Sequence, residues 1–140
     1  MSYLINIHDE GGFGIVDETN TKRIVTSILS DYNCESALVN LIYLNNEDIH
    51  QMNKKYLDHD YPTDVITFTL DEDELEGEIY IGVETAEENA KKYGAKLNEE
   101  LLRLAAHGTL HLMNEDDSTD EERERMHNLE NKYLNLLNEQ

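Results

Sequence analysis

The sequence predicts a small α/β protein, close to the α+β class, in which a mixed β-sheet is covered by about four or five helices. Short segments of β-branched and aromatic residues are interspersed with longer segments whose apolar residues recur at helical spacing. The chain has 140 residues, the usual size of one domain. No repeat, linker or low-complexity segment divides residues 1–140, so we expect one domain with one core.

Four short apolar segments are the expected strands of this sheet. Residues 3–7 and 65–70 are rich in β-branched and aromatic side chains. Residues 37–44 are almost continuously apolar, which is typical of a strand buried on both faces. Residues 78–83 alternate less cleanly and complete the sheet in this interpretation. The acidic residues 71–76 lack the ligand spacing of a calcium-binding loop, and we interpret them as a solvated connection.

The first three helices are predicted from apolar periodicity and from residues that favour helix ends. Residues 20–32 form an amphipathic helix, and residues 47–56 form a second one, capped by Asn45 or Asn46. Residues 84–93 form a third helix, which ends at Gly94. The inward face of the second helix is expected to carry Ile49, Met52 and Tyr56.

Two further helices complete the predicted fold. Asn98 is expected to cap the first of them, which contains residues 101–111. Before the second helix, Thr119 is followed three residues later by Glu122, the pattern of a capping box. This helix continues to about residue 137, and its buried stripe is expected to contain Met126, Leu129, Tyr133 and Leu136.

The charge of the chain is strongly negative, and cysteine is almost absent. The formal net charge is −20 at pH 7. Because affinity for phosphate backbones is largely cationic, an RNA-binding protein of this charge needs a local basic patch or a bound metal ion. The single cysteine, Cys34, excludes an intramolecular disulfide and favours a reducing cytoplasm. We find no secretory signal and no apolar segment near the roughly 20 residues that span a bilayer, so we expect no membrane partner.

His107 and His111 lie four residues apart in a segment that is predicted to be helical. This spacing places both imidazoles on one face of the helix, where they can bind one metal ion. A catalytic zinc site uses three protein ligands and keeps a fourth position open. Asp117 follows His111 by six residues and is a suitable third ligand, with Asp116 as the alternative. The chain must turn between them, and Asn114 can adopt the left-handed conformation that ends helices.

Two other interpretations of the histidine pair are a metal-free core pair and a zinc protease. A histidine pair with this spacing also occurs without metal, and the two histidines are then ordinary core side chains. Zinc-protease chemistry matches poorly, because Gly108 stands where those enzymes carry a general-base glutamate. A metal site without that glutamate favours hydrolysis of a different substrate or the use of a different base.

Three segments of the chain resemble motifs of one known family. Residues 107–117 read His-Gly-Thr-Leu-His-Leu-Met-Asn-Glu-Asp-Asp. Residues 52–68 read Met-Asn-Lys-Lys-Tyr-Leu-Asp-His-Asp-Tyr-Pro-Thr-Asp-Val-Ile-Thr-Phe, and residues 77–81 read Gly-Glu-Ile-Tyr-Ile. In content and order they resemble motifs of the YbeY family, metal-dependent endoribonucleases of rRNA maturation. The resemblance implies a small mixed sheet with a metal-binding central helix packed against it. It also implies one divalent ion, zinc above others, held by His107, His111 and Asp117.

The departures from the family motifs affect both the metal and the substrate. The usual third ligand is histidine, and Asp117 is a harder, anionic ligand that broadens the metal preference. The usual Gly-Tyr after the second histidine is Asn114-Glu115. An arginine that the family associates with activity is Leu57, which cannot contact phosphate.

Our sequence-based hypothesis is hydrolysis of single-stranded RNA in rRNA maturation and ribosome quality control, in the cytoplasm. The expected partners are rRNA or its precursor and ribosomal particles. The catalytic residues are not identified, but Asp64, Glu115 and Arg103 are candidates. Arg103 lies one helical turn before His107 and could replace the missing arginine. The other cations that could contact phosphates are Lys54, Lys55, Lys91, Lys92 and Lys96.

Two rival functions remain open at this point. The chain could be a non-catalytic, metal-binding ribosome-assembly factor, which Leu57 and the negative charge favour. It could also be a metallohydrolase of another substrate, such as a small phosphoester.

Overall fold

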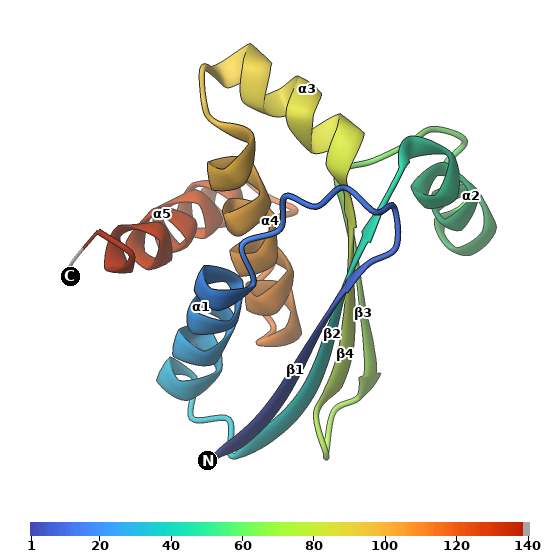
Figure 1. Cartoon of the computed structure of the whole chain (residues 1–140). Coiled ribbons are helices and arrows are strands. Elements are labelled where there is room, and N and C mark those ends of the chain that lie inside the picture. The colour runs from blue at the N-terminus through green and yellow to red at the C-terminus, as the bar shows by residue number, and fades with distance from the viewer. Residues whose placement is uncertain (139–140) are drawn as a thin grey trace.

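The computed structural model describes residues 1–138, which form one sheet with helices on both faces (Figure 1). These residues contain four strands: β1 (Ser2–Asp9), β2 (Ser36–Leu44), β3 (Val65–Asp71) and β4 (Glu76–Gly82). They also contain five helices: α1 (Glu18–Asp31), α2 (Asn46–Leu57), α3 (Val83–Tyr93), α4 (Leu97–Leu112) and α5 (Asp120–Leu136). The predicted mixed sheet with four or five helices is confirmed. None of the helices in this range is long and apolar enough to cross a membrane.

The sheet is mixed because only one of its strands reverses direction. The strand order is β1-β2-β4-β3, in which β2 is parallel to both β1 and β4, and β3 is antiparallel to β4. Parallel pairing requires a crossover, and α1 supplies the one between β1 and β2. Helices α1, α4 and α5 lie on one side of the sheet, whereas α2 lies on the other side near β3 (Figure 1). Within residues 1–138, β3 is an edge strand.

The central strand β2 is buried on one face only. Val39, Leu41 and Tyr43 are fully buried under the helices, whereas Leu38, Asn40 and Ile42 alternate with them and stay partly exposed. The expectation that residues 37–44 are buried on both faces is therefore wrong. An almost continuous apolar segment predicts burial, but α2 covers only the end of the second face, around Leu44, Ile49 and Ile66.

Helix α4 packs directly against β4, and two glycines permit this close approach. A β-carbon built on Gly108 would lie 2.6 Å from Cγ2 of Ile79, and one built on Gly77 would lie 2.6 Å from Cδ2 of Leu112. Ordinary carbon contacts are about 3.5–4.0 Å, so neither position tolerates a side chain without movement. Gly108 thus has a packing role, which accounts for its place beside His107.

Two predictions about helices are wrong. Tyr56 does not face the interior but is 56% exposed, and Asn53 takes the buried position on α2. The Asn53 amide is needed there because it donates a hydrogen bond to the carbonyl of Tyr61, at 2.9 Å. Asn98 does not cap α4, because the helix already begins at Leu97, whose side chain packs against the core.

The other helix ends follow the predicted chemistry. Asn45 caps α2, accepting a hydrogen bond from the backbone N–H of Asp48 at 2.9 Å. Gly94 ends α3 with a φ of +69°, a left-handed conformation that favours glycine. Thr119 and Glu122 form the predicted capping box of α5, which fixes where this helix starts after the turn that follows α4.

Candidate metal centre

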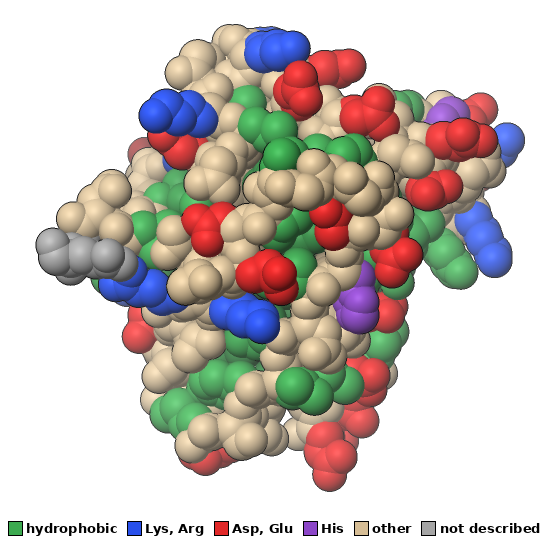
Figure 2. Space-filling view, in the orientation of Figure 1, with side chains coloured by type: hydrophobic (Ala, Val, Ile, Leu, Met, Phe, Trp, Pro, Cys, Tyr) green, Lys and Arg blue, Asp and Glu red, His purple; other side chains and the backbone are tan. Residues whose placement is uncertain are grey.

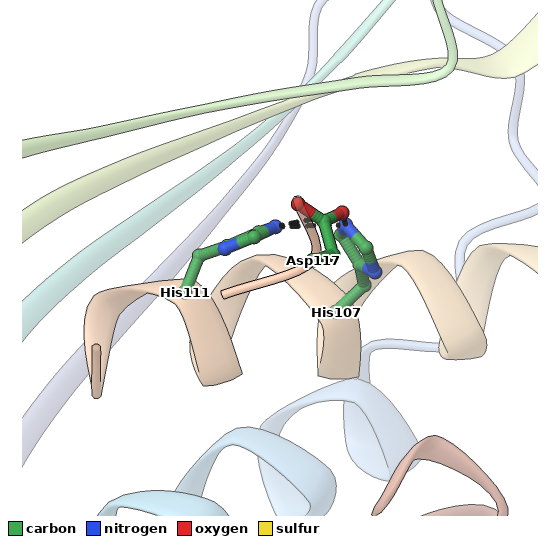
Figure 3. A group of neighbouring side chains, drawn as sticks. All are labelled: His107, His111 and Asp117. Atoms are coloured by element: carbon green, nitrogen blue, oxygen red, sulfur yellow. Dashed lines mark hydrogen bonds and ion pairs between the residues drawn. The ribbon is translucent and has the colours of Figure 1, made fainter. Parts of the chain in front are cut away.

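His107, His111 and Asp117 converge on one point beside the sheet (Figure 3). The two histidines project from the same face of α4, and their Nε2 atoms are 3.0 Å apart. Oδ2 of Asp117 lies 3.4 Å from Nε2 of His107 and 3.4 Å from Nε2 of His111. Because these residues can each offer a ligand atom within 4.8 Å of the others, the group could hold a metal ion.

A tight turn after α4 brings Asp117 back to the histidines. The helix ends at Leu112, and Asn114 has a φ of +69°, the left-handed conformation predicted for it. The backbone N–H of Glu115 then donates to the carbonyl of Leu110 at 3.0 Å, which closes the turn. The short segment after Asn114 can therefore present a carboxylate to the helix face that it has just left.

Hydrogen bonds to the far ring nitrogens fix the orientation of both imidazoles. Nδ1 of His107 lies 2.7 Å from Oε2 of Glu130, and Nδ1 of His111 lies 2.8 Å from the backbone carbonyl oxygen of Glu115. The carbonyl and the ionised carboxylate only accept, so both Nδ1 atoms donate. Each Nε2 atom then directs a lone pair toward the other and toward Asp117, and this arrangement is stable when a cation lies between them.

The spacing of the three ligand atoms fits a tetrahedral ion. Zinc bound to nitrogen and oxygen at about 2.0–2.1 Å places neighbouring ligand atoms roughly 3.3–3.4 Å apart. The separations here are 3.0 Å between the imidazoles and 3.4 Å from each of them to the carboxylate. An ion held by these three residues would keep a fourth tetrahedral position for water or substrate, as catalytic zinc sites do.

Glu130 of α5 connects the centre to Arg103. Its side chain is only 8% exposed, and its second oxygen, Oε1, accepts a hydrogen bond from Nη1 of Arg103 at 2.9 Å. Nη2 of Arg103 donates to Oδ1 of Asn131 at 2.7 Å. The guanidinium of Arg103 is thus directed toward α5 and reaches His107 only through Glu130. The structure does not support the expectation that Arg103 faces substrate.

The electrostatics around His107 favour a cation. Burial alone lowers the pKa of this imidazole, but the hydrogen bond to Glu130 and its negative charge outweigh burial. The charges of Asp117 and Asp64 act in the same direction, so the net pKa is raised. A site that stabilises the positive imidazolium also stabilises a bound metal ion at the same place.

A cleft of about 430 Å³ opens between α4 and β3 at the centre. Nδ2 of Asn89 donates to Oδ2 of Asp64 at 3.2 Å, which holds Asp64 in the wall of the cleft. Leu57 is 44% exposed and lines the same wall. No lysine or arginine is among the residues that line the cleft: Leu57, Asp64, Val65, Ile66, Thr67, Thr69, His107, His111 and Asp117.

The other acidic residues of the turn are directed away from the centre. The Glu115 carboxylate accepts hydrogen bonds from the Tyr32 hydroxyl at 2.5 Å and from Arg125 at 2.9 and 3.0 Å. The Arg125 guanidinium and the Tyr32 hydroxyl lower the pKa of Glu115. Asp116 is exposed and does not belong to the group that could hold a metal. Only the backbone carbonyl of Glu115 contacts a histidine of the centre, so its side chain ties the turn to α1 and α5.

A sequence model described as Endoribonuclease YbeY matches residues 6–138. The chain belongs to the YbeY family. An Endoribonuclease YbeY of Chlorobium phaeobacteroides is 39% identical over 118 residues, which cover 84% of this chain and 83% of that protein. One of Bacillus licheniformis is 37% identical over an alignment of 150 residues, which covers 96% of this chain and 95% of that protein. The resemblance predicted from the three motifs is therefore confirmed, and with it the class of enzyme, a hydrolase of the endoribonuclease type.

A solved structure has the same fold as this chain. The solution structure of a Thermotoga maritima protein superposes with a TM-score of 0.70 and is 32% identical. It covers 94% of this chain and 87% of the Thermotoga maritima protein. The agreement extends over nearly all of the chain, so the fold as a whole, and not the His107–Asp117 segment alone, is shared with that protein.

Glu130 is the residue of this YbeY centre that the sequence analysis missed. It lies 23 residues after His107, on a different helix, and no motif connects the two. A signal was nevertheless present, because Glu130 stands between Met126 and Tyr133 on the buried stripe of α5. A carboxylate on such a stripe requires a buried partner.

Proposed function

We propose that this chain is an active YbeY endoribonuclease that hydrolyses single-stranded RNA at one divalent ion, with zinc as the best fit. The observation that carries the proposal is the arrangement of His107, His111 and Asp117. Their ligand atoms lie 3.0–3.4 Å apart, and both imidazoles are oriented through their far nitrogens. Relatives across most of the chain are named endoribonucleases, which supports RNA as the substrate.

The donor set indicates which metals compete for the site. Two imidazole nitrogens and one carboxylate oxygen are a common ligand set of catalytic zinc. A carboxylate is harder than a third imidazole, so manganese and other oxygen-preferring ions bind better here than in a three-histidine site. The open fourth position distinguishes this centre from a structural zinc site, which is closed by protein ligands.

The residues around the centre have separate tasks in this proposal. A divalent ion at such a site lowers the pKa of coordinated water toward neutrality and offsets the negative charge of the phosphorus transition state. Asp64 is placed to accept the proton of the attacking water. Its Oδ2 accepts a hydrogen bond from Asn89, whereas its Oδ1 has only a long contact of 3.5 Å with the Thr63 hydroxyl. Of the candidates Asp64, Glu115 and Arg103, Asp64 is the one that lines the cleft.

The family resemblance supports a role in rRNA maturation. We infer that the substrate is rRNA or its precursor and that the protein acts on ribosomal particles in the cytoplasm. We expect unprocessed rRNA ends to accumulate in cells that lack the gene. Expression of the wild-type chain should reverse this accumulation, and expression of a His111→Ala chain should not.

One observation favours a non-catalytic alternative. Leu57 lines the cleft where the family motif has an arginine, and no cation replaces it among the residues of the cleft. A metal-binding ribosome-assembly factor would need no such cation. The two functions differ in the outcome of a cleavage assay, since only the enzyme cleaves purified RNA.

The deciding experiment measures metal content and RNA cleavage on the same preparations. Wild type, His111→Ala and Asp117→Ala are compared with His127→Ala, which removes an exposed histidine of α5. We expect about one ion per chain and chelator-sensitive cleavage in wild type and His127→Ala, with both lost in the other two variants. Metal binding without cleavage would establish the assembly-factor alternative. Absence of metal from the wild type would refute the proposal.

A further inference from the structure

The face of the sheet that α1 and α4 leave uncovered carries a second cavity. It has a volume of about 270 Å³ and lies between α2 and the strands β3 and β4. Its lining is mostly aromatic and apolar, with one acidic residue: Met52, Tyr56, Phe68, Leu70, Glu78 and Tyr80. On the side of α2, basic and hydrophobic side chains lie next to each other on the surface (Figure 2).

Three aromatic rings define the shape of this cavity. Tyr56 and Phe68 meet edge to face, with ring centroids 5.7 Å apart, and Phe68 and Tyr80 do the same at 6.0 Å. Phe68 and Tyr80 are held by the cluster around Ile66, whereas Tyr56 is 56% exposed. Tyr56 is therefore the ring of the three that a flat aromatic ligand can reach most readily from solvent.

The polar group of the cavity is an acceptor for hydrogen bonds. The Tyr80 hydroxyl donates to Oε1 of Glu78 at 2.9 Å. Burial raises the pKa of Tyr80 to about 12, so the hydroxyl keeps its proton at neutral pH. The bond orients the Glu78 carboxylate and uses one of its two oxygens, so the carboxylate can still accept an N–H donor from a ligand.

The cavity and the metal cleft lie on opposite faces of β3. Side chains alternate along a strand, and Phe68 lines the cavity while its neighbours Thr67 and Thr69 line the cleft. At the end of α2, Tyr56 lines the cavity and the next residue, Leu57, lines the cleft. A chain that passes around the free edge of β3 can thus occupy both.

We propose that this cavity binds one nucleobase of the RNA substrate, close to the cleaved phosphate. The inference rests on the proposed function and names its recognition element. The base stacks on Tyr56, and its exocyclic amino group donates to Glu78. Uracil offers only an N3–H between two carbonyl oxygens, which the carboxylate repels, so adenine, cytosine and guanine are preferred over uracil. Nζ of Lys55 lies over the Tyr56 ring, 5.2 Å from its centroid, so a stacking base displaces this flexible side chain toward the adjoining phosphate. The Glu78 carboxylate repels phosphate, so the cavity itself selects the base.

The chain contains a matched control for Tyr56. Lys91, Lys92 and Tyr93 stand in the last turn of α3, as Lys54, Lys55 and Tyr56 stand in the last turn of α2. Nζ of Lys92 lies 5.8 Å from the centroid of the Tyr93 ring. Tyr93 is 73% exposed and is not among the residues that line the cavity. Tyr93→Ala therefore removes the same side chain from a similar surface without touching the inferred site.

The experiment measures binding by the metal-loaded protein, with phosphorothioate RNA hexamers of adenine, cytosine or uracil as cleavage-resistant probes. We expect Tyr56→Ala to weaken binding of the adenine and cytosine hexamers about tenfold, since stacking on an aromatic side chain has that magnitude. Tyr56→Phe and Tyr93→Ala should stay within about twofold of wild type. Glu78→Gln should remove most of the preference over uracil, because the glutamine amide can also donate to a carbonyl oxygen of uracil. The control Glu76→Gln should keep this preference.

Equal affinities of the Tyr56→Ala and Tyr93→Ala proteins would overturn the inference, and so would a wild type that binds all three hexamers alike. Neither result contradicts the proposed function if the wild type still cleaves RNA and the His111→Ala protein does not. Conversely, a wild type that binds the hexamers in the predicted order but cleaves no RNA would support the subsite and refute the enzyme.

Discussion

Replacing Glu130 separates the two tasks that this residue combines, orienting His107 and neutralising Arg103. Glu130→Gln keeps the shape and an oxygen that accepts from Nδ1 of His107, but it removes the charge. Glu130→Ala removes the hydrogen bond as well. Substitution of such partners of metal-binding histidines typically costs 10–100-fold in metal affinity, which corresponds to about 1.4–2.8 kcal/mol.

The geometry places the two variants within this range. The bond from His107 is short, 2.7 Å, and Glu130 is almost completely buried, so no water can replace the lost acceptor without opening the contact between α4 and α5. We therefore expect Glu130→Ala to lose about 100-fold in zinc affinity and Glu130→Gln about tenfold. Both variants also leave Arg103 without its charged partner, which should lower the free energy of unfolding of the metal-free protein by about 1–3 kcal/mol.

The assay is a competition for zinc against a chromophoric chelator, combined with urea unfolding of the metal-free proteins. Glu124→Gln, an exposed site on the same helix, is the control for the loss of one negative charge. The reasoning fails if Glu130→Ala binds zinc as tightly as this control. It also fails if affinity falls no further in Glu130→Ala than in Glu130→Gln, because the hydrogen bond would then contribute nothing beyond charge.

Four further predictions concern the ligands, the packing and the charges. Asp117→His should still bind about one ion per chain and should bind zinc more selectively over manganese, as measured by competition between the two metals. Gly108→Ala should destabilise the protein by about 1–3 kcal/mol in urea unfolding, because the new methyl group lies 2.6 Å from Ile79; adding Ile79→Val should recover part of the loss. Burial raises the pKa of Glu100, so its charged form is disfavoured in the folded state. Glu100→Gln should therefore raise the melting temperature at pH 7, and the gain should vanish as the pH falls below the ordinary pKa of glutamate. Leu57→Arg should increase RNA cleavage without changing metal content, and an unchanged rate would show that a cation at this position is dispensable.

The convergence of the three proposed metal ligands was predictable because it depends on local geometry. His107 and His111 share a helix, and Asn114 marks the turn that returns Asp117, so the sequence contains all the information that brings the three together. The choice between Asp116 and Asp117 was not predictable in the same way. Neighbouring residues of a turn point in different directions, and the hydrogen bonds of Glu115 to Tyr32 and Arg125 determine which one faces the histidines.

The parts that the sequence analysis missed depend on contacts between distant segments. Glu130 contacts His107 only because α5 packs across α4, and this crossing has no local signature. Tyr56 matches the apolar periodicity of α2, yet it lies beyond the cluster that α2 covers and remains exposed. Likewise, residues 37–44 have the composition of a doubly buried strand, but the chain has too few helices on the second face to cover them.

The charge distribution of the cleft connects the metal centre with the nucleobase subsite. On the face shown in Figure 2, acidic side chains are spread widely, whereas basic ones gather in a few places. Asp64 and Asp117 line the cleft without a lysine or arginine beside them, so a bound divalent cation does little more than cancel their two charges. A nuclease with such a cleft gains little affinity from phosphates, whose attraction normally dominates RNA binding. The remaining source of affinity is contact with the bases, and the exposed Tyr56 ring, across the edge of β3 from the cleft, is suited to it.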